Sequence, residues 1–253
     1  MLNDKSILIT GGTGSFGHTF VSMTLAKYNP RRLVIYSRDE MKQWKMSKLY
    51  ANDPRVRFFI GDVRDKDRLF RALDGIDYVV HAAVTKIVAT AEYNPFECVK
   101  TNIMGTINLI DACIDRGIKR VVALSIDKAG SVIPFFLSIA DKGILPITDD
   151  RMTRFMITLK EGAELVWHAF EYMVGGEIYV KKIPSMKVID VALAGVPDAK
   201  HEIVGIRPGE KLHEQMIGTG DALYTYEYPD HFKIFPDIHN WSNDTYRIKD
   251  GHI

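Results

Sequence analysis

The amino-acid sequence predicts an α/β protein with a doubly wound parallel sheet, and three observations support this prediction. Short apolar runs alternate with segments of helical periodicity through the first half of the chain. These runs lack the polar alternation of half-exposed strands, as expected for strands that are buried on both faces. The first run, residues 7–9, leads straight into a turn that contains Gly11, Gly14 and Gly17.

The glycine turn joins this first strand to a predicted helix at residues 18–27, which has apolar residues at helical spacing. Its G-x-x-G-x-x-G spacing suits a backbone that turns tightly, approaches a pyrophosphate and lets the helix pack on the sheet. The helix N-terminus adds N–H groups and the positive end of its dipole. The segment therefore predicts a dinucleotide site of Rossmann type. The expected contacts are Gly11, Thr13, Gly14, Ser15, Phe16 and Gly17.

A second buried strand, Arg32–Ser37, ends in Arg38 and Asp39. In dinucleotide folds the residues after this strand contact the adenosine ribose: an acid binds the 2′-hydroxyl, whereas an arginine binds a 2′-phosphate. Arg38 beside the Ser37 hydroxyl favours NADP as the cofactor, and Asp39 leaves NAD possible. The expected contacts in this segment are Ser37, Arg38, Asp39, Glu40, Met41 and Lys42.

Two further strands complete the predicted cofactor site. The strand at residues 57–60 precedes a Gly-Asp-Val turn whose aspartate can meet the adenine edge. The strand at 77–81 precedes two alanines, which let a cofactor pass near the backbone, and then a lysine that could reach the cofactor or a substrate phosphate. The expected contacts are Asp62, Val63, Ala82 and Lys86.

The fifth strand, residues 120–125, follows one long predicted helix at 95–116. After this strand the alternation stops, because only Ala129 and Gly130 separate Lys128 from Ser131. A further parallel strand would need a crossover of a dozen or more residues. We therefore expect a dinucleotide-binding domain at residues 1–130 and a smaller, mainly substrate-binding region at 131–253.

The second region is less regular than the first. It contains a predicted helix at 159–173, a strand at 177–180, a helical segment at 186–194 and a strand with a turn at 203–211. The polar tail from Asn240 is expected to be a loose end.

Composition narrows the class of protein. The 253 residues are 46% hydrophobic and 26% charged, which is ordinary for a globular enzyme. A net charge of +1 gives no bulk attraction to nucleic acid or to an acidic membrane. With two cysteines, no signal-type segment and no membrane-spanning apolar run, we expect a cytoplasmic protein. No cluster of Cys and His has metal-ligand spacing, so we expect no metal site.

Several motifs together resemble one family. They include Gly-Gly-Thr-Gly-Ser-Phe-Gly at 11–17, Asp-Lys-Ala at 127–129, Arg-Met-Thr-Arg-Phe at 151–155 and Arg-Pro-Gly-Glu-Lys-Leu-His-Glu at 207–214, with further segments at 36–40, 59–65, 81–83, 92–95, 100–102 and 124–125. Over nearly its whole length the chain is similar to the inverting UDP-N-acetylglucosamine 4,6-dehydratases. These are extended short-chain dehydrogenase/reductase proteins that open the pseudaminic acid pathway.

The resemblance implies an NADP-dependent lyase that dehydrates a UDP-sugar and inverts its C5 centre. It implies that the hydride of C4 passes to NADP and returns at C6, after water has left across C5 and C6. Asp127 then suits the acid for the departing C6 hydroxyl, and Lys128 the base for the C5 proton. The expected substrate contacts are Lys86, Arg154, Arg207 and Lys211, the last three as donors to the UDP diphosphate. The family also implies a homo-oligomer, for which the helix predicted at 95–116 is a candidate contact face.

The chain departs from the family in several places, chiefly after Gly130. The family carries several dozen residues, including a Tyr-x-x-x-Lys pair, between its Asp-Lys-Ala and Ser-Val-Ile-Pro-Phe-Phe motifs, whereas here Gly130 is followed by Ser131. Position 126 is Ile where the family has Thr. Either the protein lacks this segment or the sequence as given omits it, and we favour the second explanation. An intact mass near 28.7 kDa would indicate the short form.

Two alternative functions stay open at this point. A nucleotide-sugar 4-epimerase or a retaining 4,6-dehydratase of the same superfamily would share the cofactor half, but would use Tyr-x-x-x-Lys without Asp127 and Lys128 as the acid and base. A catalytically inactive cofactor-binding scaffold is the third possibility, and it follows if the segment after Gly130 is truly absent.

Overall fold

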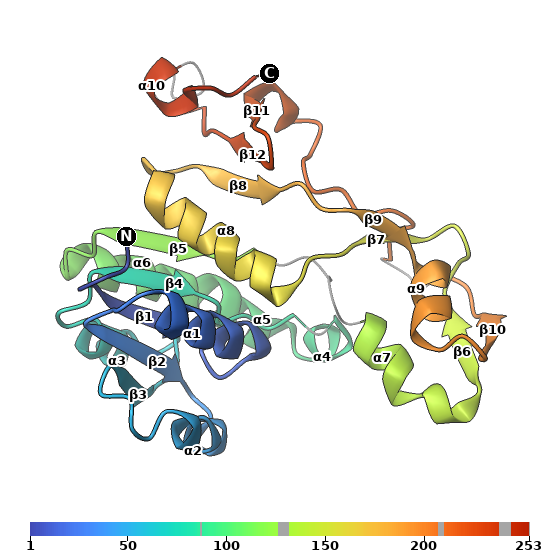
Figure 1. Cartoon of the computed structure of the whole chain (residues 1–253), viewed down its shortest axis with the longest axis horizontal. Helices are drawn as coiled ribbons and strands as arrows, with labels where there is room; N and C mark the ends of the chain where they lie inside the picture. Colours follow the sequence, from blue (N-terminus) through green and yellow to red (C-terminus); the bar gives the residue numbers. More distant parts are fainter. Residues whose placement is uncertain (87, 126–131, 207–209, 238–243, 253) are drawn as a thin grey trace. The chain divides into compact units, whose positions relative to one another are not determined.

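The computed structural model describes residues 1–86, 88–125, 132–206, 210–237 and 244–252 (Figure 1). The chain forms two compact units: Met1–Ile126 together with Leu159–Tyr172, and Asp127–Thr158 together with Met173–Ile253. Helix α8 (Leu159–Tyr172) thus belongs to the first unit, although it follows the boundary expected at residue 130. It joins the first unit because its Trp167 packs against helix α1, where the indole Nε1 donates to Thr24 Oγ1 at 3.2 Å.

The first unit contains a five-stranded parallel sheet in the order β3-β2-β1-β4-β5. The chain runs from the central β1 outward to β3 and then continues on the other side with β4 and β5, which confirms the predicted doubly wound topology. Thr10, the last residue of β1, lies between Tyr36 and His81 of its two neighbours, so the carboxyl ends of these strands meet at one edge. The strands are β1 (Ser6–Thr10), β2 (Arg32–Ser37), β3 (Val56–Ile60), β4 (Tyr78–His81) and β5 (Arg120–Ala123).

Helices cover both faces of this sheet (Figure 1). On one face, Leu8 and Val79 of the sheet share a buried core with Leu69 of α3 and Leu109 of α6. Tyr78 points to the opposite face, as the alternation of a strand requires, and stacks on a phenylalanine of α8 at 5.2 Å. The helices of this unit include α1 (Ser15–Lys27), α2 (Glu40–Leu49), α3 (Lys66–Ala72) and α6 (Gly105–Asp115).

The long helix predicted at 95–116 has three parts. Helix α5 (Pro95–Val99) continues into a π-helical turn, Lys100–Met104, and then into α6. The π turn was not predicted, because the apolar spacing of the sequence is the same on either side of it. Gly105 follows the turn, and a Cβ there would lie 2.7 Å from a methyl group of Val63, so glycine lets α6 approach the end of β3. A short helix, α4 (Val88–Tyr93), precedes α5.

The described residues of the second unit form three small sheets. Strand β6 (Ile144–Ile147) pairs with β10 (Lys200–Ile203) in parallel, β7 (Thr153–Phe155) pairs with β9 (Ser185–Lys187), and β12 (His231–Ile234) lies between β11 (Thr225–Glu227) and β8 (Ile178–Lys181). One apolar core combines Phe136, Leu145, Ile147, Met152, Val188 and Ala192. The helices are α7 (Val132–Ser138), α9 (Val188–Gly195) and α10 (Thr245–Ile248).

Two expectations about the second unit were wrong. The strand expected to begin at Ile203, in the predicted strand and turn at 203–211, lies earlier in the chain, because β10 ends at Ile203 where its partner β6 also ends. The described part of the tail, residues 244–252, is anchored rather than loose, since Glu227 and His252 exchange backbone hydrogen bonds of 2.6 and 3.0 Å. Arg247 adds a hydrogen bond of 2.8 Å to the carbonyl oxygen of Gly175. Polar tail residues can thus be ordered by backbone pairing that composition does not reveal.

Candidate nucleotide-binding site

The glycine turn packs tightly against two neighbouring parts of the first unit. Gly11 has a φ of +65°, and a Cβ there would lie 2.7 Å from the carbonyl oxygen of Ala82, which follows β4. At Gly17 a Cβ would lie 2.2 Å from the carbonyl oxygen of Gly12, so helix α1 can pack on the turn only through a glycine. Gly14 begins α1 without a side-chain cap. The turn therefore has the close approaches expected of a phosphate-binding loop.

A polar contact connects this turn to the end of β2. Thr13 Oγ1 lies 2.7 Å from Ser37 Oγ. Gln43 of α2 is buried and donates to the carbonyl oxygens of Ser37, at 2.7 Å, and Phe59, at 3.0 Å. These two bonds hold the ends of β2 and β3 together, next to Arg38. The structure thus brings Thr13, Ser37 and Arg38 to one edge of the sheet.

Asp39 caps helix α2. Its Oδ1 accepts a hydrogen bond of 2.9 Å from the backbone N–H of Lys42, and its Oδ2 lies 3.6 Å from the ammonium of the same residue. The hydrogen bond from the Lys42 backbone lowers the pKa of Asp39, so its carboxyl group is ionised at neutral pH. Glu40 and Met41 lie exposed in the first turn of this helix.

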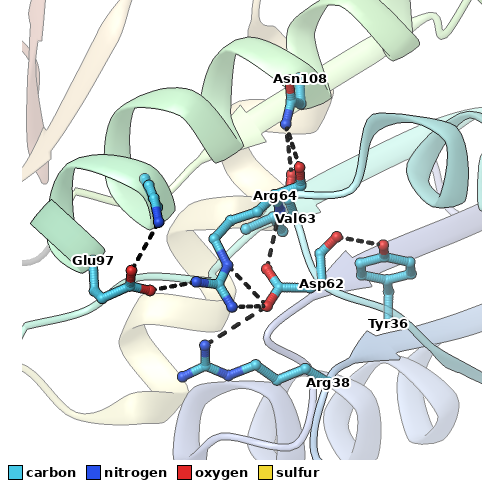
Figure 2. Close-up of polar contacts among 8 residues, drawn as sticks. Tyr36, Arg38, Asp62, Val63, Arg64, Glu97 and Asn108 are labelled. Atoms are coloured by element: carbon cyan, nitrogen blue, oxygen red, sulfur yellow. Dashed lines mark hydrogen bonds and ion pairs between the residues drawn. The ribbon is translucent and has the colours of Figure 1, made fainter.

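Asp62 is the centre of an ion-pair network (Figure 2). Its carboxylate accepts bonds of 3.0 and 2.7 Å from the Arg64 guanidinium, and lies 3.7 Å from that of Arg38. Arg64 also contacts Glu97 of α5, while the Tyr36 hydroxyl donates to the Asp62 carbonyl oxygen at 2.8 Å. Burial raises the pKa of Asp62, but the hydrogen bonds from Arg64 outweigh it and hold that pKa below its usual value. The neighbouring Val63 is buried.

The segment after β4 is fixed by a chain of hydrogen bonds through His81. Thr106 Oγ1 donates to the carbonyl oxygen of Asn102 at 2.7 Å, so it accepts from His81 Nε2 at 3.2 Å. His81 Nδ1 then accepts from Thr10 Oγ1 at 2.7 Å. Thr10 Oγ1 also accepts hydrogen bonds from the backbone N–H groups of Ala82 and Ala83, at 3.1 and 3.3 Å. His81 therefore serves as a neutral structural residue and sets the path of the backbone where a cofactor would pass.

This network predicts a pH dependence. Burial lowers the pKa of His81, so the unfolded state binds a proton at a higher pH than the folded state does. The free energy of unfolding should therefore fall as the pH drops from about 6.5, the ordinary histidine pKa, toward the folded pKa. Urea unfolding between pH 7.5 and 5.5 should show a flatter pH dependence for His81→Asn, which cannot be protonated, than for the parent protein. Equal slopes would contradict the assigned role.

The predicted substrate contacts differ in their surroundings. Lys86 is exposed. The residue before it, Thr85, is held by Asn102, whose side chain makes two hydrogen bonds of 2.8 and 2.9 Å to the Thr85 backbone. Lys211 is exposed, whereas the Arg154 guanidinium is buried among protein acceptors, which speaks against direct contact with a diphosphate. Asp127, Lys128 and Arg207 lie outside the described residues. The sequence did not predict roles for four further residues that shape the site. Thr10 and Arg64 lie at or near strand ends, whereas Gln43 and Asn102 lie within helical segments, where the sequence gives no sign of their contacts.

Among the residues that the structure describes, no group of three or more His, Cys, Asp and Glu side chains could hold a metal ion. No described helix combines the length and the apolar character that crossing a membrane requires.

The fold and the glycine turn define a dinucleotide-binding protein of Rossmann type. Residues 7–130 and 129–236 match the family model described as "Polysaccharide biosynthesis protein". The chain belongs to this family of polysaccharide biosynthesis proteins, which are extended short-chain dehydrogenase/reductase proteins.

Individual relatives agree with this assignment. The chain is 46% identical over 284 residues, 94% of this chain and 85% of the relative, to "UDP-N-acetylglucosamine 4,6-dehydratase (inverting)" of Campylobacter jejuni. It is 34% identical, over 92% of this chain and 84% of the relative, to "UDP-glucose 4-epimerase" of Rickettsia conorii. Among solved structures, Pen from Bacillus thuringiensis superposes with a TM-score of 0.87 at 31% identity, covering 94% of this chain and 89% of that one.

The comparisons also locate a difference in length. The alignment with the Campylobacter protein extends over 284 residues and this chain has 253, so at least 31 positions of that relative have no counterpart here. The two family matches meet at residues 129–130, where the sequence lacks a crossover between parallel strands.

Proposed function

We propose that the protein catalyses the NADP-dependent 4,6-dehydration of UDP-N-acetylglucosamine with inversion at C5. The observation that carries the proposal is the 46% identity, over 94% of the chain, with the Campylobacter protein of that name. The product would be a UDP 4-keto-6-deoxy-L-sugar, made in the cytoplasm for pseudaminic acid or surface polysaccharide synthesis.

Residues at the end of β2 support NADP over NAD. Ser37 and Thr13 place two hydroxyl groups 2.7 Å apart beside Arg38, and such donors suit a 2′-phosphate. The Asp39 carboxylate, which would bind a free 2′-hydroxyl, caps helix α2 instead. When bound, the nicotinamide supplies hydride acceptance from C4 and hydride return to C6. Asp62 and Val63 would border the adenine, while Ala82 and Lys86 would border the cofactor where it passes β4.

The cofactor preference has a direct test. Arg38→Ala should weaken NADP binding by about 1.5–3 kcal/mol, the loss of one charge-assisted contact, and should barely change NAD binding. Arg31→Ala is a matched control, because the Arg31 side chain is 62% exposed beside Asp77, much as that of Arg38 is 64% exposed beside Asp62. Titration of each variant with both cofactors measures the two affinities. Equal losses for NADP and NAD in Arg38→Ala would contradict a 2′-phosphate contact.

The acid and the base would come from the segment after β5. Lys128 would remove the C5 proton, for which it must be neutral, so burial or a nearby cation must lower its pKa. Asp127 would protonate the departing C6 hydroxyl. Both follow the carboxyl end of a parallel strand, where ligands bind in this architecture. Arg207 and Lys211 would contact the UDP diphosphate, and Lys86 the substrate.

A homo-oligomer is part of the proposal. Six apolar side chains along α5, the π turn and α6 are exposed at spacings of three and four residues, which places them on one side of this helical segment. They are Phe96, Val99, Ile103, Ile107, Ile110 and Ile114. A second copy of the chain would remove this surface from water.

Product identity tests the function. Incubation with UDP-N-acetylglucosamine and NADP should give a 4-keto-6-deoxy sugar of L configuration by NMR. A C4 epimer would favour the second candidate, an epimerase, for which the 34% identity with the Rickettsia protein is the supporting observation. A D-configured product would indicate a retaining dehydratase. Cofactor binding without turnover, together with an intact mass of 28.7 kDa, would indicate an inactive scaffold.

A further inference from the structure

We propose that Arg154 is a positioning residue, whose buried guanidinium holds residues 210–214 so that Lys211 can contact the diphosphate of a UDP-sugar. The inference rests on the proposed function for its ligand. It assigns the diphosphate contact to Lys211 and gives Arg154, predicted from sequence as a direct contact, a different role.

The Arg154 guanidinium is fully engaged by the protein. Its Nη1 donates to the carbonyl oxygens of Thr153, at 2.7 Å, and Leu212, at 3.3 Å. Its Nη2 donates to the carbonyl oxygen of Lys211 at 3.2 Å and lies 3.6 Å from Glu210 Oε1. Its Nε lies 3.7 Å from Glu214 Oε1. With 5% of the side chain exposed, all three nitrogens face protein acceptors.

Strand β7 provides the rigid base for this contact. Arg154 pairs with Met186 of β9, while the preceding Thr153 donates its backbone N–H to the carbonyl oxygen of Leu212 at 3.1 Å. Thr153 Oγ1 also lies 2.8 Å from His213 Nδ1, and Leu212 packs against the apolar core of the unit. Residues 210–214 are therefore held from one side, and the Lys211 side chain, between two anchored neighbours, is exposed.

Charge gives Arg154 a second effect. Glu210 and Glu214 place two carboxylates close to Lys211 in the chain, and these would repel a diphosphate. The Arg154 guanidinium lies beside both carboxylates and offsets them. A planar fork of donors can hold three carbonyl oxygens and two carboxylates together, whereas the single ammonium of a lysine cannot.

A double-mutant cycle on UDP binding tests the proposal. Calorimetry should give roughly ten- to hundredfold weaker UDP binding for Lys211→Met, the loss of a charge-assisted contact. Arg154→Gln should cause a loss of similar size, and the double variant should bind no more weakly than the weaker single variant. If the affinity losses of the two single variants multiplied in the double variant, the proposal would be overturned, because Arg154 would then contact UDP independently of Lys211. An unchanged affinity in Arg154→Gln would overturn it as well.

Two further variants separate positioning from stability and from charge. Arg247→Gln removes another mostly buried arginine of the same unit, 12% exposed, and should leave UDP binding unchanged. Arg154→Lys keeps the charge and the fold more readily than Arg154→Gln, and should still show most of the UDP loss. Full UDP affinity in Arg154→Lys would overturn the positioning role, and so would an equal loss in Arg247→Gln. If the parent protein binds NADP but not UDP, the proposed function itself fails, whatever the variants do.

Discussion

Lys128→Met is expected to abolish the incorporation of solvent deuterium at C5 of the sugar, because the variant lacks the base that removes the C5 proton. Loss of a positioned base lowers the rate by roughly 10²–10⁴-fold. Affinity for NADP and for the UDP-sugar should survive, since the glycine turn and the diphosphate contacts are intact. NMR in D₂O measures the exchange, and calorimetry the affinities.

Asp127→Asn is the paired control for this variant. Without the acid, the C6 hydroxyl leaves poorly, so C5 exchange should persist while the yield of 4-keto-6-deoxy product falls. The two variants therefore separate the base from the acid in one NMR experiment. Full exchange in Lys128→Met would contradict the assignment, and so would a loss of sugar binding large enough to explain the lost rate.

Gly17→Ala is expected to have the largest effect on cofactor binding. The added Cβ would lie 2.2 Å from the carbonyl oxygen of Gly12 and 2.4 Å from its carbon, so backbone atoms of the turn must move. Overpacking of this kind costs about 1–3 kcal/mol or more, and a cost of 3 kcal/mol is roughly a hundredfold in affinity. Titration with NADP measures the loss.

Gly195→Ala is the matched control, because Gly195 lies in helix α9 and a Cβ there meets no described atom within 4 Å. It should leave NADP affinity unchanged. If Gly17→Ala bound NADP as tightly as the control variant, the pyrophosphate would not lie against the glycine turn as we propose.

The regular half of the fold was predictable because its signals are local. Buried parallel strands appear as apolar runs, and each of the five predicted runs became a strand of the sheet. Helix α8 was correctly located, but its place in the first unit was not predicted, since the contact between Trp167 and Thr24 joins residues 143 positions apart. Likewise, β10 was misplaced because its extent depends on pairing with β6, which no short window of sequence contains.

The sequence predicted which residues lie at the candidate site better than it predicted the role of each one. Ser37, Arg38 and Thr13 were expected near the cofactor from strand ends alone, and the structure brings them together. Arg154 was expected to face a ligand, because its type suits a diphosphate. Its burial among the acceptors of residues 210–214 depends on the pairing of β7, so its role could be inferred only from the structure.

The central claim is that the hydride removed from C4 returns at C6. UDP-N-acetylglucosamine that carries deuterium at C4 tests this most directly, in a single NMR measurement of the product after turnover by the parent protein in ordinary water. We predict that the deuterium appears in the C6 methyl group of a 4-keto-6-deoxy sugar. Deuterium that is found again at C4, on an epimerised or unchanged sugar, would contradict the dehydratase assignment.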